Sequence, residues 1–122
     1  MGKTLLLAED DELLASLLNF RLEKGGYKVV LSRDGREVKH YLETQMPDII
    51  VSDIMMPYFS GMELIDFVRN ELQSKIPIII ISSAGNEENV LNAFDLGAND
   101  FIAKPVSPSE LMVRVARELN KT

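Results

Sequence analysis

The sequence predicts an α/β fold: a doubly wound, five-stranded parallel sheet of strand order 2-1-3-4-5 with five helices. Short apolar runs alternate with helical patterns along the 122 residues, as in parallel sheets that carry helices on both faces. The runs at residues 49–52 and 77–81 are apolar without alternation, which is typical of strands buried on both faces. Because crossovers between parallel strands are right-handed, few strand orders are possible. In the common order 2-1-3-4-5, the switch point lies between the first and third strands.

The composition indicates one domain spanning residues 1–122. With 46% hydrophobic residues, the chain is long enough for one core and too short for two. The net charge of −6 argues against direct nucleic-acid binding. The absence of cysteine excludes disulfides, thiolate catalysis and cysteine-ligated metals. No apolar run has the length of a membrane span or of a signal peptide, so we expect a cytoplasmic protein without membrane contact.

Helix caps and apolar spacing place the elements between these runs. The predicted strands are residues 4–8, 27–32, 49–52 with Asp53, 77–81 and 100–103. The predicted caps are residues 9–12, Asp34 with Glu37, Ser60 with Glu63, Asn86, and Ser107 with Pro108 and Glu110. The apolar helix positions are Leu14, Leu17, Leu18 and Leu22; Val38, Tyr41 and Leu42; Leu64, Ile65, Val68 and Leu72; Val90, Leu91 and Phe94; and Leu111, Met112, Val115, Ala116 and Leu119.

Three carboxylates are predicted to meet at the switch point. Asp53 ends the third strand, and Glu9 and Asp10 follow the first. Ligands of such sheets bind at the carboxyl ends of the strands. Converging carboxylates repel one another unless a cation joins them, and all-oxygen ligands suit Mg²⁺. The acidic pair can also be read as Asp10-Asp11, but the apolar strand ends at Ala8, which favours Glu9-Asp10.

Lys104 and a serine hydroxyl are predicted to complete a phosphoryl-binding cage around Asp53. Lys104 follows the fifth strand, and Ser82 and Ser83 follow the apolar run of the fourth. Strand alternation allows only one of the two serines into the site, and the following Ala84 favours Ser83. An aspartate can act as the nucleophile that accepts a phosphoryl group. Capping, a surface lysine and a turn serine explain each residue singly, but their convergence favours the phosphoryl site.

The same residues form motifs that resemble a receiver (CheY-like) domain of bacterial two-component response regulators, over essentially the whole chain. The matching segments are residues 6–12 with Glu9-Asp10, Asp53-Ile54-Met55-Met56-Pro57 followed by Ser60-Gly61, Ser83-Ala84, residues 96–101 and Lys104-Pro105. Each motif is weak alone, but five in the right order and spacing are specific.

The resemblance implies that Asp53 accepts phosphate from a phosphohistidine of a sensor histidine kinase or a phosphotransfer protein. It implies a phosphoacceptor domain that assists its own phosphorylation and dephosphorylation, rather than an enzyme. The implied Mg²⁺ ligands are Asp10, Asp53 and the Met55 carbonyl, with Glu9 acting through water. Lys104 and Ser83 would hold phosphoryl oxygens, and Phe101 would be the aromatic switch.

The resemblance also implies that phosphorylation switches the face formed by the fourth helix, fifth strand and fifth helix. This face can support a homodimer, and the chain is either a stand-alone receiver or part of a regulator with an output domain. Asp100, Glu110 and Arg114 resemble part of the charge set of receivers linked to winged-helix domains. His40 is expected on the surface, away from the crevice.

Three competing classes fit the residues less well. An FMN carrier of the same fold would need a phosphate-binding loop after the first strand, where this chain is acidic. An aspartate phosphatase needs an acid at Met55. A pseudo-receiver would lack a site residue.

We further expect a cis peptide bond before Pro105. Met55 has no side-chain donor or acceptor and Gly85 has no side chain, so neither would hold a water in line with the phosphoryl group. We therefore expect slow autodephosphorylation.

Overall fold

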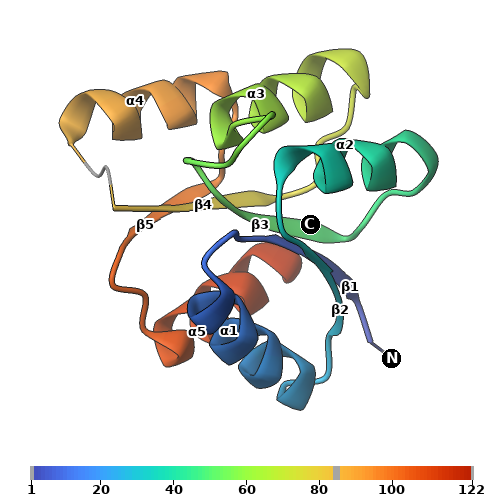
Figure 1. The fold of residues 1–122 in the computed structure, drawn as a ribbon, viewed down its shortest axis with the longest axis vertical. Coiled ribbons are helices and arrows are strands. Elements are labelled where there is room, and N and C mark those ends of the chain that lie inside the picture. Colours follow the sequence, from blue (N-terminus) through green and yellow to red (C-terminus); the bar gives the residue numbers. More distant parts are fainter. Residues whose placement is uncertain (1, 84–85, 122) are drawn as a thin grey trace.

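A computed structural model describes residues 2–83 and 86–121, which form a sheet between two layers of helices (Figure 1). Five parallel strands run in the order β2-β1-β3-β4-β5, which confirms the predicted topology. Helices α1 and α5 cover one face of the sheet, and α2, α3 and α4 cover the other. The elements are β1 (Thr4–Ala8), α1 (Glu12–Lys24), β2 (Lys28–Ser32), α2 (Gly35–Thr44), β3 (Ile49–Asp53), α3 (Gly61–Asp66), η1 (Phe67–Glu71), β4 (Ile78–Ser82), α4 (Glu87–Leu96), β5 (Asp100–Ala103) and α5 (Pro108–Leu119).

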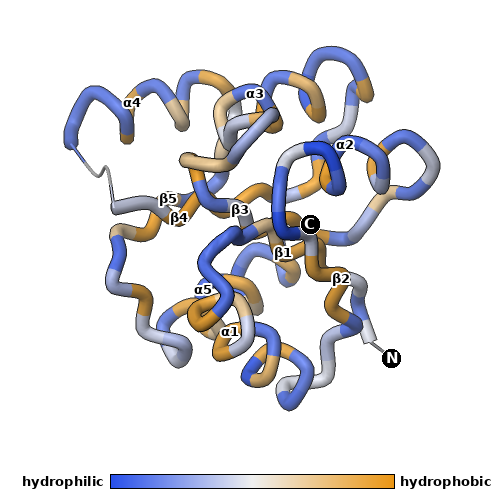
Figure 2. Tube along the Cα trace, viewed as in Figure 1, coloured by the Kyte–Doolittle hydropathy of each residue, from blue (hydrophilic) through white to orange (hydrophobic). Residues whose placement is uncertain are grey.

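The core consists of two apolar clusters, one on each face of the sheet. Leu6, Ile50 and Ile80 contribute to the cluster beneath α2, α3 and α4. The alternating neighbours Leu7 and Val51 belong to the cluster beneath α1 and α5. Both faces of β1, β3 and β4 are therefore buried, and these strands are largely orange in Figure 2. This explains why their sequences are apolar without alternation.

The predicted caps are present at the helix starts. Ser60 and Glu63 form a reciprocal capping box, as expected. Asp11, Asp34, Asn86 and Ser107 accept backbone N–H bonds at the starts of α1, α2, α4 and α5. After Asp66, the third helix continues as a π-helical turn, η1. The regular apolar spacing of this segment gave no indication of that wider turn.

Two apolar stripes are only partly buried. Leu17 on α1 is 48% exposed, and on α4 Leu91 and Phe94 are 55% and 43% exposed. The side chain that α4 buries completely is Ala93. Helical spacing identifies an apolar stripe but not the side of the helix that faces the sheet, and the small Ala93 is the residue at that contact. Among residues 2–83 and 86–121, no helix combines the length and apolar character needed to cross a membrane.

Candidate functional site

Two adjacent strands bring the predicted carboxylates together. β1 and β3 are paired in register, with Ala8 beside Ser52, so the residues that follow these two emerge at one edge of the sheet. Glu9 is fully buried, Asp53 is 4% exposed, and Asp10 is exposed. One carboxylate oxygen from each of the three lies within 4.8 Å of the others. The structure thus places the three acids at one point, as the sequence predicted.

The helix cap decides between the two possible acidic pairs. Asp11 is the N-cap of α1, and its Oδ1 accepts the N–H groups of Leu13 at 3.0 Å and Leu14 at 3.1 Å. Its carboxylate is therefore engaged with the helix backbone. The Asp11 N–H in turn donates to Glu9 Oε2 at 3.0 Å. Glu9 and Asp10 are consequently the members of the run that belong to the cluster with Asp53.

Lys104 reaches this cluster from the end of β5. Its Nζ lies 2.8 Å from Asp53 Oδ2 and 3.2 Å from Glu9 Oε1, and its side chain is 21% exposed. Burial alone would lower the pKa of Lys104, but hydrogen bonds and charge attraction from Asp53 and Glu9 raise it above 10.5. The contacts with Asp53 and Glu9 therefore stabilise the charged form of Lys104 within the site. The Lys104-Pro105 peptide bond is cis, as predicted.

The environment of Glu9 fits a bound cation. Burial, and then the charge of Asp53, raises the pKa of Glu9 above its ordinary 4.5, against the opposing Asp11 N–H and Lys104. Glu9 Oε1 is buried and has no hydrogen-bond partner among the described residues, although the Lys104 ammonium lies at ion-pair distance. A buried carboxylate with spare acceptor capacity beside two further carboxylates is an oxygen-only donor set of the kind Mg²⁺ prefers.

The loop after β3 borders the carboxylates. The Met55 N–H donates to Asp53 Oδ1 at 3.2 Å, and the Met55 side chain is largely exposed. A crevice of about 360 Å³ is lined by Asp10, Ile54, Met55, Met56, Pro57 and Ser60. Asp10 of the carboxylate cluster and Ile54, the residue after Asp53, line this crevice, so it adjoins the buried strand end that carries Asp53.

The two serines at the end of β4 differ in burial. Ser82 is the last residue of β4 and is fully buried, whereas Ser83 is exposed. In the described part of the chain, Ser83 makes no hydrogen bond to Asp53 or Lys104. Ala84, on which the choice of Ser83 rested, lies outside the described residues. Asp53 pairs with Ile81, so strand alternation places Ser82 on the face opposite to Asp53, and the choice of Ser83 stays a prediction.

Phe101 lies on the same face of the sheet as Ser82. It pairs with Ile80, two residues before Ser82 on β4, and side chains two residues apart in a strand point to the same face. Phe101 is half-buried and packs against the cluster beneath α2, α3 and α4. His40 has an 88% exposed side chain on α2 and lies outside the cluster of carboxylates, as expected.

Comparisons with known proteins agree with this geometry. The response regulator receiver domain family matches residues 5–116. The alkaline phosphatase synthesis transcriptional regulatory protein PhoP of Bacillus subtilis is 34% identical over all of this chain and 50% of its own length. The phosphate regulon transcriptional regulatory protein PhoB of Pseudomonas aeruginosa is also 34% identical, over all of this chain and 54% of its own length. The chain thus spans about half the length of these curated relatives.

Solved structures show the same fold. The receiver domain of the Francisella response regulator 1452 superposes with a TM-score of 0.91 at 31% identity, covering 97% of both chains. The chemotaxis response regulator CheY4 of Vibrio cholerae superposes with a TM-score of 0.89 at 27% identity, covering 97% of this chain and 99% of its own. The strand order, the convergent carboxylates and these matches lead to one conclusion: the chain belongs to the receiver domain family of two-component response regulators, in which phosphorylation of an aspartate is general.

Proposed function

We propose that Asp53 is the phosphoacceptor of this receiver and takes its phosphoryl group from a phosphohistidine of a sensor kinase or phosphotransfer protein. The observation that carries this assignment is the contact of 2.8 Å between the Lys104 ammonium and Asp53 Oδ2, beside two further carboxylates. In the transfer, the phosphorus–nitrogen bond breaks as a phosphorus–oxygen bond to Asp53 forms. The electron pair of the broken bond stays on the histidine ring.

The neighbouring residues have separate parts in this proposal. Asp10, Asp53 and the Met55 carbonyl would hold Mg²⁺, with Glu9 acting through water; the bound ion supplies positive charge for the phosphoryl oxygens. Lys104 would hold a phosphoryl oxygen, and this contact would replace the present one between the Lys104 ammonium and Asp53 Oδ2. Ser83 would hold another phosphoryl oxygen, which is supported by its position two residues after Ile81, the strand partner of Asp53.

The assignment of Asp53 is tested with acetyl phosphate and intact-mass analysis. We expect one added phosphoryl group in the presence of Mg²⁺, and none with a chelator or in Asp53→Asn. Asp48→Asn is a matched control, because this aspartate lies outside the cluster and accepts the Thr4 N–H instead. A phosphoryl group that persists in Asp53→Asn and maps to Ser83 or His40 would contradict the assignment.

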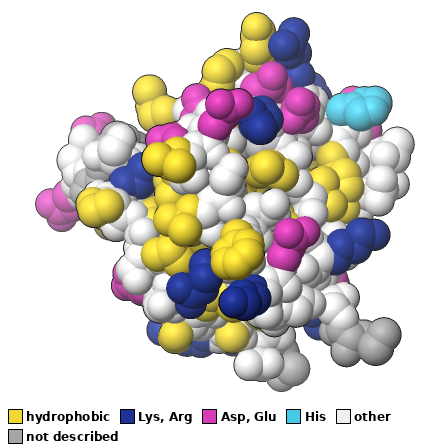
Figure 3. Space-filling model, turned by 60° about the horizontal axis from the view of Figure 1, so that its bottom comes forward, with side chains coloured by type: hydrophobic (Ala, Val, Ile, Leu, Met, Phe, Trp, Pro, Cys, Tyr) yellow, Lys and Arg dark blue, Asp and Glu magenta, His cyan; other side chains and the backbone are white. Residues whose placement is uncertain are grey.

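We further propose that the phosphodonor docks on α1 beside the crevice. Leu13, Leu17 and Phe20 are 82%, 48% and 61% exposed on this helix. Leu13 and Leu17 share a groove with Lys104 and Pro105, so the apolar surface is continuous with the phosphoacceptor site. Hydrophobic side chains gather on the side of the molecule that carries α1 and α5 (Figure 3).

This docking face is tested by comparing two phosphodonors. Leu17→Ser should slow transfer from a phosphorylated kinase selected from a panel, and leave labelling by acetyl phosphate unchanged. Val113→Ser removes an apolar side chain that is 66% exposed on α5 and serves as the control. If Leu17→Ser slows both donors equally, the residue supports the site itself rather than the docking of a protein.

The output belongs to the same proposal. Phosphorylation would draw the Ser83 hydroxyl toward Asp53 and let Phe101 turn inward, which remodels the face of α4, β5 and α5. Arg114 on this face pairs with Asp100 and Glu110, each at 2.8 Å. The face would then contact an output domain, a target protein or a second copy. We place this signalling in the cytoplasm.

A further inference from the structure

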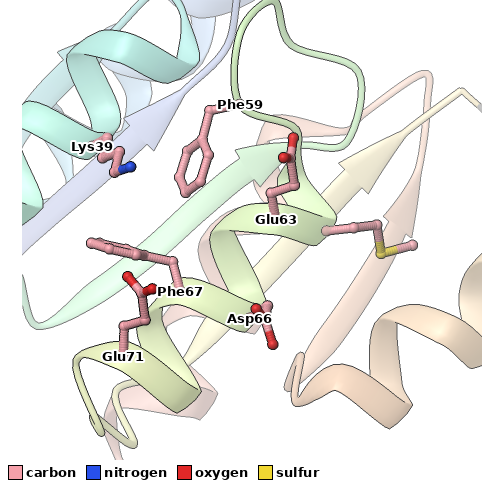
Figure 4. A pocket seen from close by; sticks show the side chains of 7 residues that line it. Lys39, Phe59, Glu63, Asp66, Phe67 and Glu71 are labelled. Carbon is pink, nitrogen blue, oxygen red and sulfur yellow. The ribbon is translucent and has the colours of Figure 1, made fainter.

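A second recess lies between α2 and α3, apart from the phosphoacceptor crevice. It measures about 340 Å³ and is lined by Lys39, Phe59, Met62, Glu63, Asp66, Phe67 and Glu71. Figure 4 shows Lys39 extending from α2 toward the two phenylalanine side chains. Phe59 and Phe67 meet edge to face, with ring centroids 5.8 Å apart and planes at 84°. No role proposed above uses this recess, which we call the α2–α3 groove.

The aromatic pair in this groove already holds a cation. The Lys39 ammonium lies 5.9 Å from the Phe59 ring centroid and 5.6 Å from that of Phe67, distances typical of cation–π contacts. Within the described part of the chain, Lys39 forms no ion pair with a carboxylate. The exposed Lys39 ammonium thus lies against the two rings and pairs with none of the groove carboxylates, of which Glu63 accepts the Ser60 N–H and Asp66 accepts from Asn70.

Two of the three groove carboxylates lie in a row rather than at a metal centre. Glu63, Phe67 and Glu71 follow one another at four-residue spacing along α3 and η1, which places them on one side of the helix. The group of acids that does converge on one point among the described residues is the cluster at Asp53. An extended organic cation fits a row of this kind, whereas Mg²⁺ requires converging oxygens.

We propose that the α2–α3 groove is a docking site for a basic segment of a partner protein. An arginine or lysine of that segment would lie on Phe59 and Phe67, and Glu71 would pair with its charge. Charge complementarity favours such a partner: three carboxylates face one ammonium in the groove. The net charge of −6 disfavours a second copy of this chain or a nucleic acid as the occupant.

The groove is physically connected to the phosphoacceptor loop. Phe59 belongs to the loop between β3 and α3, which begins beside Met55. The Gly35 N–H of α2 donates to the Pro57 carbonyl at 3.0 Å, and a Cβ at Gly35 would clash with the Phe59 Cβ. The N-terminus of α2 and this loop are thus in direct contact, so an occupant of the groove contacts both elements.

The proposal is tested with a capped, fluorescein-labelled peptide that carries two arginines, titrated into the complete chain. Fluorescence anisotropy gives the affinity, and NMR shifts locate the binding site. Glu71→Gln removes a carboxylate that has no hydrogen bond or ion pair with another described residue, so the fold should not change. We expect roughly threefold weaker binding. Glu23→Gln on α1 makes the same charge change on the opposite face of the sheet and should have little effect.

Lys39 supplies a test of opposite sign. Lys39→Met vacates the two rings, so the peptide should bind roughly threefold more tightly than it does to Lys28→Met. That control removes an equal charge from an exposed position at the start of β2. Two results would overturn the proposal: equal weakening by Glu71→Gln and Glu23→Gln, or peptide-induced shifts centred on Asp10 and Asp53 instead of residues 59–71.

Discussion

Replacing Lys104 with methionine should destabilise the protein by about 3 kcal/mol in Mg²⁺-free buffer at pH 8. The lysine lies within 3.2 Å of a carboxylate oxygen on both Glu9 and Asp53, whose side chains are 0% and 6% exposed. Removing one partner of a buried ion pair costs about 3–5 kcal/mol, because the other charge stays behind. The lower end applies here because Lys104 is itself 21% exposed. For a chain of this length the midpoint of thermal unfolding should fall by roughly 10 °C.

The destabilisation should depend on pH in a defined direction. Burial, and then the charge of Asp53, raises the pKa of Glu9 above 4.5. A carboxyl group with a raised pKa in the folded state contributes stability below its unfolded pKa, and this contribution is lost as the pH rises through the folded value. Without Lys104 the pKa of Glu9 rises further, so the loss becomes larger. The pKa of Lys104 is raised above 10.5, which keeps the wild-type lysine charged below that pH.

The assay is urea unfolding followed by circular dichroism, between pH 4 and pH 8 and with a chelator present. The difference in free energy of unfolding between wild type and Lys104→Met should be small at pH 4 and grow toward pH 8. Lys75→Met, at an exposed position, is the control. Equal stability of Lys104→Met and Lys75→Met at pH 8 would show that Lys104 does not balance the buried carboxylates. The same conclusion would follow if the difference in free energy of unfolding between wild type and Lys104→Met did not change with pH.

Three further predictions concern the phosphorylated state. Ser83→Ala should slow acetyl phosphate labelling about tenfold and Ser82→Ala should not; the reverse order would contradict the choice of Ser83. Phosphorylation should change NMR shifts around Phe101, and changes confined to the loop after β3 would reject the switch. The phosphorylated double variant Met55→Asn, Gly85→Glu should lose its phosphoryl group faster than the wild type; residue 85 lies outside the described residues. Decay no faster than wild type would reject the proposed role of these positions in placing water.

The fold was predictable because every level of the sequence favours the same arrangement. The residues at 49–52 and 77–81 are apolar on both faces, and β3 and β4 are completely buried. Ser60 with Glu63 predicted a capping box that the structure contains. The π-helical turn η1 was not predicted, because Val68 and Leu72 keep an ordinary helical spacing through it. A change in hydrogen-bond register that preserves the apolar stripe leaves no signal in that stripe.

Orientation is the property that the sequence specified least well. Leu91 and Phe94 lie at helical spacing on α4, yet both are exposed while Ala93 is buried. Leu17 is a similar case on α1. In each helix the apolar spacing is genuine, but the surface it contacts is decided by the packing against the sheet. An apolar stripe that the domain leaves exposed is itself informative, since it marks surface available to a partner.

The two serines show where strand periodicity stops being a guide. Alternation holds only while the chain stays in the sheet, and β4 ends at Ser82. Ser82 therefore keeps the orientation of Ile80, on the face where Phe101 packs. Ser83 has left the strand, so counting by twos from Ile81 no longer fixes its direction. Asp53 escapes this ambiguity because it is itself paired with Ile81 of β4, whereas Glu9 and Asp10 follow Ala8, the last paired residue of β1. A functional residue is thus located most securely where neighbouring strands constrain it, and least securely one residue beyond the last pair.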